Sequence, residues 1–108
     1  MTREERYGRS LADLYGIRIE PYLFCDGEIS YWKAYAPKLK SFMLFYTFRT
    51  WDELLFGSDE NSSLNVFIDE LNNIGFNELF YANILDFKSL DELDILLTLA
   101  GKNAYSET

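Results

Sequence analysis

The chain has 108 residues, with ten Lys and Arg against eighteen Asp and Glu, and it contains no histidine. Hydrophobic residues make up 48% and aromatics 18%, too many for a disordered acidic chain. This length fits one domain, so we expect a single compact unit over 1–108 with a frayed tail at 102–108. Without histidine, Ser-His-Asp and Cys-His catalytic systems and histidine-held zinc or haem are excluded. The single cysteine excludes a disulfide framework and a thiolate zinc cluster.

The first ten residues and the longest apolar runs bear on the compartment. The segment MTREERYGRS is charged and is followed by no apolar stretch typical of a secretory signal. The longest mostly apolar runs, 42–48 and 79–85, are well short of the ~20 residues that a membrane helix needs. Together with the single cysteine, these features predict a cytoplasmic protein that does not associate with membranes.

The first predicted element is a helix over 2–15. Thr2 and Glu5 form a capping box, in which Thr2 caps a backbone N–H and Glu5 reaches back. Gly16 is placed to end the helix in a left-handed conformation, whereas Gly8 weakens its middle by about 1 kcal/mol relative to alanine. One apolar stripe follows helical spacing and consists of Tyr7, Leu11, Leu14 and Tyr15.

Three strands are predicted next. Residues 17–25 alternate in polarity, and Pro21 indicates an edge position or a bulge. Asp26-Gly27 predicts a type I′ hairpin turn, because that turn needs positive φ at both central positions. The alternation continues through Ile29 and Tyr31 in the returning strand. Residues 41–49 are apolar on both faces, which predicts a central strand.

After residue 50 the pattern becomes helical. Thr50 to Glu53 forms a capping box for a short helix that ends at Gly57, and Ser89 to Glu92 forms another for a helix that ends at Gly101. Between them, a helix that ends at Gly75 carries Leu64, Phe67, Ile68, Leu71 and Ile74 on one face. Residues 79–85 fit either a strand or a helix, and their short length favours a strand. The predicted fold class is α+β: a small, mainly antiparallel sheet of about three to four strands packed by three or four helices.

Charge is distributed unevenly along the chain. Residues 1–50 contain eight basic and six acidic residues, a net charge of +2, whereas residues 51–108 contain two basic and twelve acidic residues, a net charge of −10. Acids in first helical turns complement the helix dipole, and a solvated acidic face aids solubility. Those reasons do not explain the mid-helix Asp69 and Glu70 or the scarcity of compensating lysines, since helix faces usually mix both signs. A recognition surface for a basic partner is therefore the alternative to a plain solvated face.

Candidate metal and catalytic motifs all have simpler explanations. Asp59, Asn61, Ser63 and Glu70 match calcium-loop spacing, but Leu64 stands where that loop needs glycine. The six glycines are scattered as turn and cap residues, so there is no phosphate-binding loop. The acids lie on exposed helix starts, with no sign of an apolar pocket that would suit acid–base catalysis. Cys25, without a histidine to activate it, fits an inert thiol. We expect neither enzymatic activity, cofactor nor metal.

Aromatic residues concentrate between 22 and 56, where eleven of thirty-five residues are Phe, Tyr or Trp. Rings near Lys33 and Arg49 could stack single-stranded bases, but the net charge of −8 opposes phosphate binding. Most of these rings must form the core, and the remainder would serve as interface anchors. The best exposed candidates lie in the segment 31–35, where Trp32 should face away from Ile29 and Tyr31.

The sequence thus favours a non-catalytic acidic inhibitor that binds the basic cleft of a nucleic-acid-processing enzyme and mimics its nucleic acid. Phage anti-CRISPR or anti-restriction proteins, and immunity proteins or antitoxins to nuclease toxins, follow this logic of charge and size. The alternative is a self-assembling structural or adaptor domain in which the first-helix arginines meet the acids of a neighbour. The expected partner-binding residues are Asp59, Glu60, Asp69, Glu70, Asp91, Glu92, Asp94, Trp32, Tyr35 and Trp51.

Overall fold

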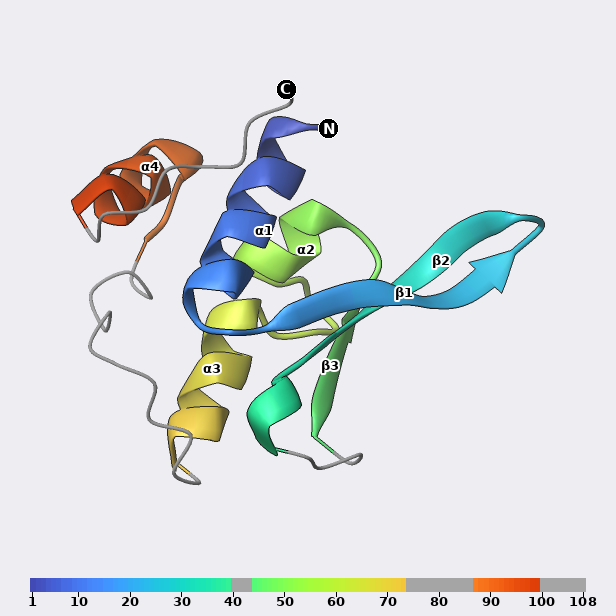
Figure 1. The fold of residues 1–108 in the computed structure, drawn as a ribbon. Helices are drawn as coiled ribbons and strands as arrows, with labels where there is room; N and C mark the ends of the chain where they lie inside the picture. The colour runs from blue at the N-terminus through green and yellow to red at the C-terminus, as the bar shows by residue number, and fades with distance from the viewer. Residues whose placement is uncertain (40–43, 74–86, 100–108) are drawn as a thin grey trace.

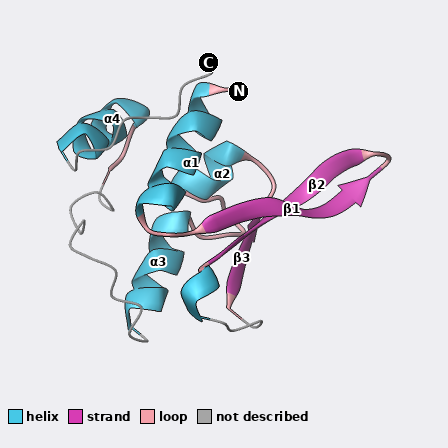
Figure 2. Cartoon of the chain, in the orientation of Figure 1, coloured by secondary structure: helices cyan, strands magenta, loops and turns pink. Residues whose placement is uncertain are grey.

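The computed structural model describes residues 1–39, 44–73 and 87–99. Its three strands form one antiparallel sheet in the order β1-β2-β3, and its helices gather to one side of that sheet (Figures 1 and 2). The predicted α+β class is confirmed. In chain order the elements are α1 (Arg3–Leu14), β1 (Arg18–Cys25), β2 (Glu28–Tyr35), a 3-10 turn η1 (Pro37–Leu39), β3 (Phe45–Phe48), α2 (Trp51–Phe56), α3 (Leu64–Asn73) and α4 (Leu90–Leu99).

Three of the helices begin at the predicted hydroxyl caps. Each hydroxyl oxygen accepts a hydrogen bond of 3.1–3.2 Å from the backbone N–H three residues later, in the pairs Thr2–Glu5, Thr50–Glu53 and Ser89–Glu92. In α2 and α4 the glutamate also reaches back, but it accepts from the N–H before the cap rather than from the cap itself. Glu53 Oε1 accepts from Arg49 N at 3.0 Å and Glu92 Oε2 from Lys88 N at 2.6 Å. The bonds to the hydroxyls satisfy backbone N–H groups that a helix start leaves unpaired, and the bonds to the two glutamates hold the residue before each cap.

The hairpin turn and one mid-helix glycine have clear structural causes. Asp26 has φ 53° and Gly27 has φ 83°, so the predicted turn with two positive φ angles is confirmed. A Cβ atom at Gly8 would lie 3.0 Å from Leu54 Cδ2 and 3.0 Å from Trp51 Cε3. The glycine therefore allows α1 and α2 to approach closely, which offsets its low helix propensity.

The strand order corrects one prediction. β1 is an edge strand, with register irregularities between Pro21 and Leu23 and between Leu23 and Phe24, as Pro21 indicated. The central strand is β2, and β3 is the other edge of the sheet formed by the described residues, so the prediction of a central β3 was wrong. Apolar residues on both faces of β3 did not mean burial on both faces: Phe48 is fully buried, whereas Phe45 is 38% exposed.

The core lies between the helices and one face of the sheet. That face carries Ile19 from β1, Ala34 from β2 and Phe48 from β3, all in contact with the central hydrophobic cluster. The remaining members come mainly from one side of each of the helices α1 to α4, including Leu11, Leu54, Leu55, Leu64, Ile68, Leu71, Leu93 and Leu97. The opposite face of the sheet is not covered by any described helix (Figure 1).

Several predictions fall outside the described residues. They are the beginning of the third strand at 41–43, the end of the third helix at Ile74 and Gly75, the strand at 79–85, the stop at Gly101 and the frayed tail at 102–108.

Candidate partner-binding surfaces

Helix α4 presents a side that combines carboxylates with large apolar groups. Leu93 and Leu97 are fully buried against the core, which turns the other side of the helix to solvent. There Ile95 is 60% exposed and Leu99 is 79% exposed. Helical spacing aligns Asp91, Ile95 and Leu99 along the axis, with Asp94 beside them. We call these four residues (Asp91, Asp94, Ile95 and Leu99) the α4 outer face.

Three of the seven predicted acids interact with neighbours in their own chain among the described residues. Asp91 Oδ1 lies 2.6 Å from Arg3 Nη2, because α4 packs against α1, and this hydrogen bond raises the pKa of Arg3. Glu60 Oε2 lies 3.5 Å from Arg49 Nη2, and Glu92 serves the cap of its own helix. The contact between Arg3 and Asp91, which the self-assembly alternative placed between two molecules, thus forms within one chain.

The seven acids lie in three separate segments of the structure. Asp91, Glu92 and Asp94 belong to α4, which packs on the side of α1 remote from the sheet (Figure 1). Asp59 and Glu60 lie in the connection from α2 to α3, where Glu60 contacts the residue that follows β3. Asp69 and Glu70 are exposed on α3. The structure therefore divides the acidic residues among three segments, of which the α4 outer face alone adds strongly exposed aliphatic side chains to the carboxylates.

The two predicted tryptophan anchors are half-buried and contact each other. Their ring centroids are 5.3 Å apart, and Trp32 also stacks on Phe48. The Arg9 guanidinium lies 4.8 Å from the Trp51 ring and 5.5 Å from the Trp32 ring, and its Nε donates to Glu5. Trp32 does face away from Tyr31, but it points toward the helices rather than toward solvent. The expectation that Trp32 is exposed is corrected for that reason.

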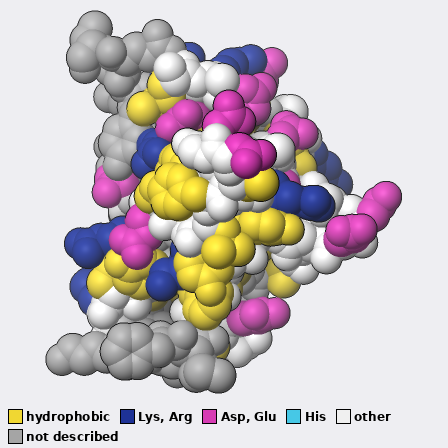
Figure 3. All heavy atoms as spheres, turned by 90° about the vertical axis from the view of Figure 1, so that its right-hand side faces the viewer, with side chains coloured by type: hydrophobic (Ala, Val, Ile, Leu, Met, Phe, Trp, Pro, Cys, Tyr) yellow, Lys and Arg dark blue, Asp and Glu magenta, His cyan; other side chains and the backbone are white. Residues whose placement is uncertain are grey.

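The uncovered face of the sheet gathers a different group of rings. Lys33 Nζ lies 5.6, 5.1 and 5.3 Å from the ring centroids of Tyr22, Tyr35 and Phe45, which come from all three strands. The Tyr22 and Phe45 rings are 5.6 Å apart, and the Tyr35 hydroxyl donates to Glu20 at 3.3 Å. Figure 3 looks onto the side of the molecule from which the hairpin extends and shows a central group of hydrophobic side chains with charged ones around it.

Of the predicted anchors, the structure places Tyr35 in this group of rings. Tyr22 and Phe45, which contact Lys33 beside it, were not among the predicted site residues. The signal that could have found this face is the alternation Tyr31, Lys33, Tyr35 in β2, which places three large side chains on one side of the strand.

A buried carboxylate fixes the segments around β3. The Glu53 side chain is 9% exposed and accepts from Arg49 N at 3.0 Å and from Asn61 Nδ2 at 3.3 Å. Burial alone would raise the pKa of Glu53, but the hydrogen bonds from Arg49, Asn61 and Ser58 and the Arg49 charge outweigh it and hold the pKa below its ordinary value. Nearby, the Tyr46 hydroxyl donates to Ser62 O at 2.6 Å, and burial raises the pKa of Tyr46.

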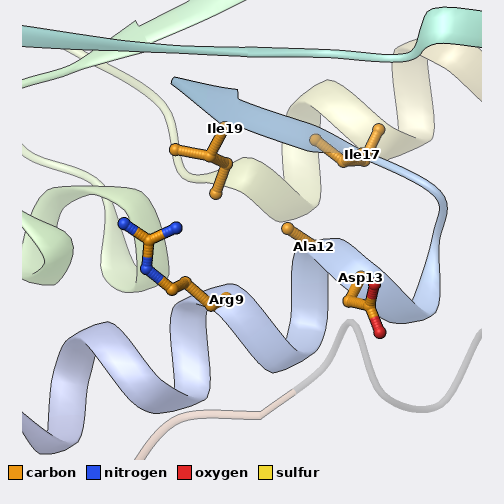
Figure 4. Close-up of a pocket in the computed structure, with 5 residues that line it drawn as sticks. All are labelled: Arg9, Ala12, Asp13, Ile17 and Ile19. Atoms are coloured by element: carbon orange, nitrogen blue, oxygen red, sulfur yellow. The ribbon is translucent and has the colours of Figure 1, made fainter. Parts of the chain in front are cut away.

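Two hollows are lined by described residues. One of about 240 Å³ lies beside Glu53 and is lined by Tyr31, Thr47, Arg49, Glu53, Glu60 and Asn61. Its only cation, Arg49, is paired with Glu60, so the lining favours neither an anion nor a cation. The other, of about 100 Å³, lies between α1 and the start of β1. There Ile19 points toward α1 while Asp13 points away from the strand (Figure 4), and the space is small for a ligand of drug size.

The described residues hold no group of three His, Cys, Asp or Glu side chains positioned to bind a metal. Asn61, one of the residues with calcium-loop spacing, has a structural role instead. Its side-chain amide donates to Thr47 O at 2.7 Å and to Glu53. None of the helices in the described ranges is both long and apolar enough to cross a membrane.

Comparison with known proteins finds no matching family model, no matching curated protein and no matching solved structure.

Proposed function

We propose that this chain is a non-catalytic acidic inhibitor that binds the basic cleft of a nucleic-acid-processing enzyme. The observation that carries the proposal is the α4 outer face, where the exposed carboxylate of Asp94 and that of Asp91, which pairs with Arg3, lie beside the exposed side chains of Ile95 and Leu99. Carboxylates on a rigid helix offer negative charges to the lysines and arginines that such enzymes use to hold phosphates. Ile95 and Leu99 add apolar contact that a nucleic-acid backbone lacks.

The charged and the apolar side chains of this face would contribute to binding in different ways. Exposed charges mainly accelerate encounter and select partners of opposite sign, whereas desolvated apolar groups supply most of the affinity. Asp69 and Glu70 on α3, and Asp59 and Glu60 before it, extend the negative field of residues 51–108 without sharing the α4 surface. These acids would steer a basic partner toward the molecule, and Ile95 and Leu99 would anchor it.

In this proposal the chain acts in the cytoplasm. It would be a phage protein of the anti-CRISPR or anti-restriction type, or an immunity protein or antitoxin to a nuclease toxin. Small size and negative charge support this class. The exposed, unpaired Cys25 suits a reducing compartment, where thiols are not driven into disulfides.

The test is inhibition of purified DNA-cleaving enzymes of these classes: a CRISPR-associated nuclease, a restriction enzyme and a nuclease toxin domain. We expect one class to be inhibited in competition with its DNA, with an affinity that falls as salt is raised. Asp94→Lys should weaken inhibition at least about tenfold, since it reverses a charge at the contact. The matched control Glu28→Lys reverses an exposed acid on the hairpin and should change inhibition by less than about twofold.

Two results would contradict the proposal. One is inhibition that survives Asp94→Lys and a second variant, Ile95→Ser, because the α4 outer face would then not be the contact. The other is stabilisation of the enzyme–DNA complex instead of competition with DNA. A pull-down followed by elution with duplex DNA identifies the target where the three classes show no inhibition.

A further inference from the structure

The end of the β1–β2 hairpin exposes an unusual amount of apolar surface. Phe24 is 62% exposed, Leu23 50%, Tyr22 44% and Ile29 37%, and Phe45 of β3 is 38% exposed and contacts Tyr22. Every residue from 21 to 29 is exposed, and the hairpin extends beyond the helices (Figure 1). We call Tyr22, Leu23, Phe24, Ile29 and Phe45 the hairpin patch. Contiguous apolar patches of this kind usually mark an interaction site.

The charge of the hairpin selects the kind of partner. Residues 18–35 contain two basic and three acidic residues, a net charge of −1, whereas the whole chain carries −8. A basic partner would be drawn to the acidic helices rather than to this nearly neutral surface. Two copies of the chain repel each other, and this repulsion is weakest where they meet through a surface of little net charge. The hairpin is such a surface.

We infer that the hairpin patch is the interface of a two-fold symmetric dimer of this chain. Each copy presents the same rings to the other, as a two-fold contact requires. The rings around Lys33 continue the patch across the open sheet face, so the contact can spread over all three strands. The α4 outer face lies on the far side of α1 from the sheet, so both copies keep it accessible (Figure 1). The inference is independent of the proposed inhibition.

The contact uses the face of the sheet rather than the edge of β1. Pro21 has no N–H to donate, and the ladder between β1 and β2 is irregular on both sides of Leu23. Proline and bulges are the devices that keep edge strands from pairing with another chain. A second copy therefore meets side chains here rather than free backbone groups.

Sedimentation velocity at several concentrations, in about 0.05 M and about 0.5 M NaCl, tests the inference. We expect a monomer–dimer equilibrium that tightens as salt rises, because screening removes repulsion between two chains of charge −8 and leaves the apolar contact intact. Phe24→Ser should raise the dimer dissociation constant roughly tenfold or more, because in a two-fold dimer the substitution removes one ring from each copy. The matched control Val66→Ser changes an apolar residue on α3 of 42% exposure and should leave the constant unchanged.

The single cysteine gives a second readout. A spin label on Cys25 reports the distance between the two hairpin tips, and both labels lie near the axis of the inferred dimer. A head-to-tail assembly of sheet on α4 would instead separate successive labels by about one molecular length, and the longest extent of the molecule is 41 Å.

Four outcomes would overturn the inference: a monomer at every soluble concentration, a dimer that dissociates as salt rises, a dimer abolished by Asp94→Lys, or a dimer insensitive to Phe24→Ser. Tight binding of a fluorescent oligothymidylate that Phe24→Ser removes would assign the hairpin patch to single-stranded nucleic acid instead. Inhibition that survives both Asp94→Lys and Ile95→Ser, with the dimer intact, would overturn the proposed function alone.

Discussion

The β3–α2 region and the β1–β2 hairpin tip are both rich in aromatic residues, yet the structure uses them in opposite ways. Phe48 is fully buried between Tyr46, Trp32 and Trp51, whereas Phe24 at the hairpin tip is 62% exposed. The difference lies in what covers each segment: α2 packs against β3, α1 packs against α2 and β1, and no described helix reaches the hairpin tip (Figure 1). Aromatic content alone therefore does not distinguish core from surface: the rings of the first region stabilise the fold, whereas those of the second are left available for the inferred dimer contact.

The largest expected effect is in the core. Phe48→Ala should lower the free energy of unfolding by about 3–5 kcal/mol, because it removes a fully buried ring and leaves a cavity beside three aromatic neighbours. Urea denaturation followed by tryptophan fluorescence or circular dichroism measures this loss. Phe48→Leu is the control that keeps most of the apolar volume and should cost clearly less. Equal stability of wild type and Phe48→Ala would refute the core assignment.

A smaller effect is expected at the buried carboxylate of the same region. Glu53→Gln should cost about 1.5–3 kcal/mol at neutral pH, because charge-assisted hydrogen bonds from Arg49 N and Asn61 are weakened. The folded-state pKa of Glu53 lies below its ordinary value. Its contribution is therefore present above the unfolded-state pKa and is lost as the pH falls through the folded value.

The effect of pH on the stability of Glu53→Gln tests the direction of the pKa shift of Glu53. The stability difference between wild type and Glu53→Gln should shrink as the pH is lowered through the acidic range, as measured by urea denaturation at each pH. Glu4→Gln changes an acid in the first turn of α1, and the difference between it and wild type should be much smaller at neutral pH. A difference for Glu53→Gln that grows toward low pH would contradict the assigned direction of the pKa.

The smallest effect should come from the hairpin tip. Phe24→Ser is expected to change the free energy of unfolding by less than about 0.5 kcal/mol, because the ring is mostly in water already. Thermal or urea unfolding at a concentration where the chain is monomeric measures it, so that dimerisation does not contribute. A large loss would show that the tip contributes to the core after all, and the separation of stability from recognition would fail.

Much of the local structure could be predicted because its causes are local. The hydroxyls of Thr2, Thr50 and Ser89 cap their helices through bonds that span three residues, and Asp26-Gly27 makes its turn within four. The periodic apolar residues of α1 and α3 likewise indicated which sides would be buried.

The predicted site was less accessible to sequence reasoning. Alternation placed Trp32 and Tyr31 on opposite faces, but which face the helices would cover depends on how α1 and α2 cross the sheet. The position of β3 at the edge depends on pairing partners elsewhere in the chain. How the three segments that carry the seven acids lie relative to one another follows from helix packing, which charge counts do not specify.

By itself, the sequence determined the helix starts, the hairpin turn, the apolar stripes and the excess of negative charge after residue 50, because each depends on residues close together in the chain. Only the tertiary structure decided that Arg3 pairs with Asp91, that Arg9 covers two tryptophan rings, and that Lys33 lies among three rings from three strands. Those contacts join residues up to 88 positions apart, and the packing of whole helices and strands, rather than any local preference, brings them together.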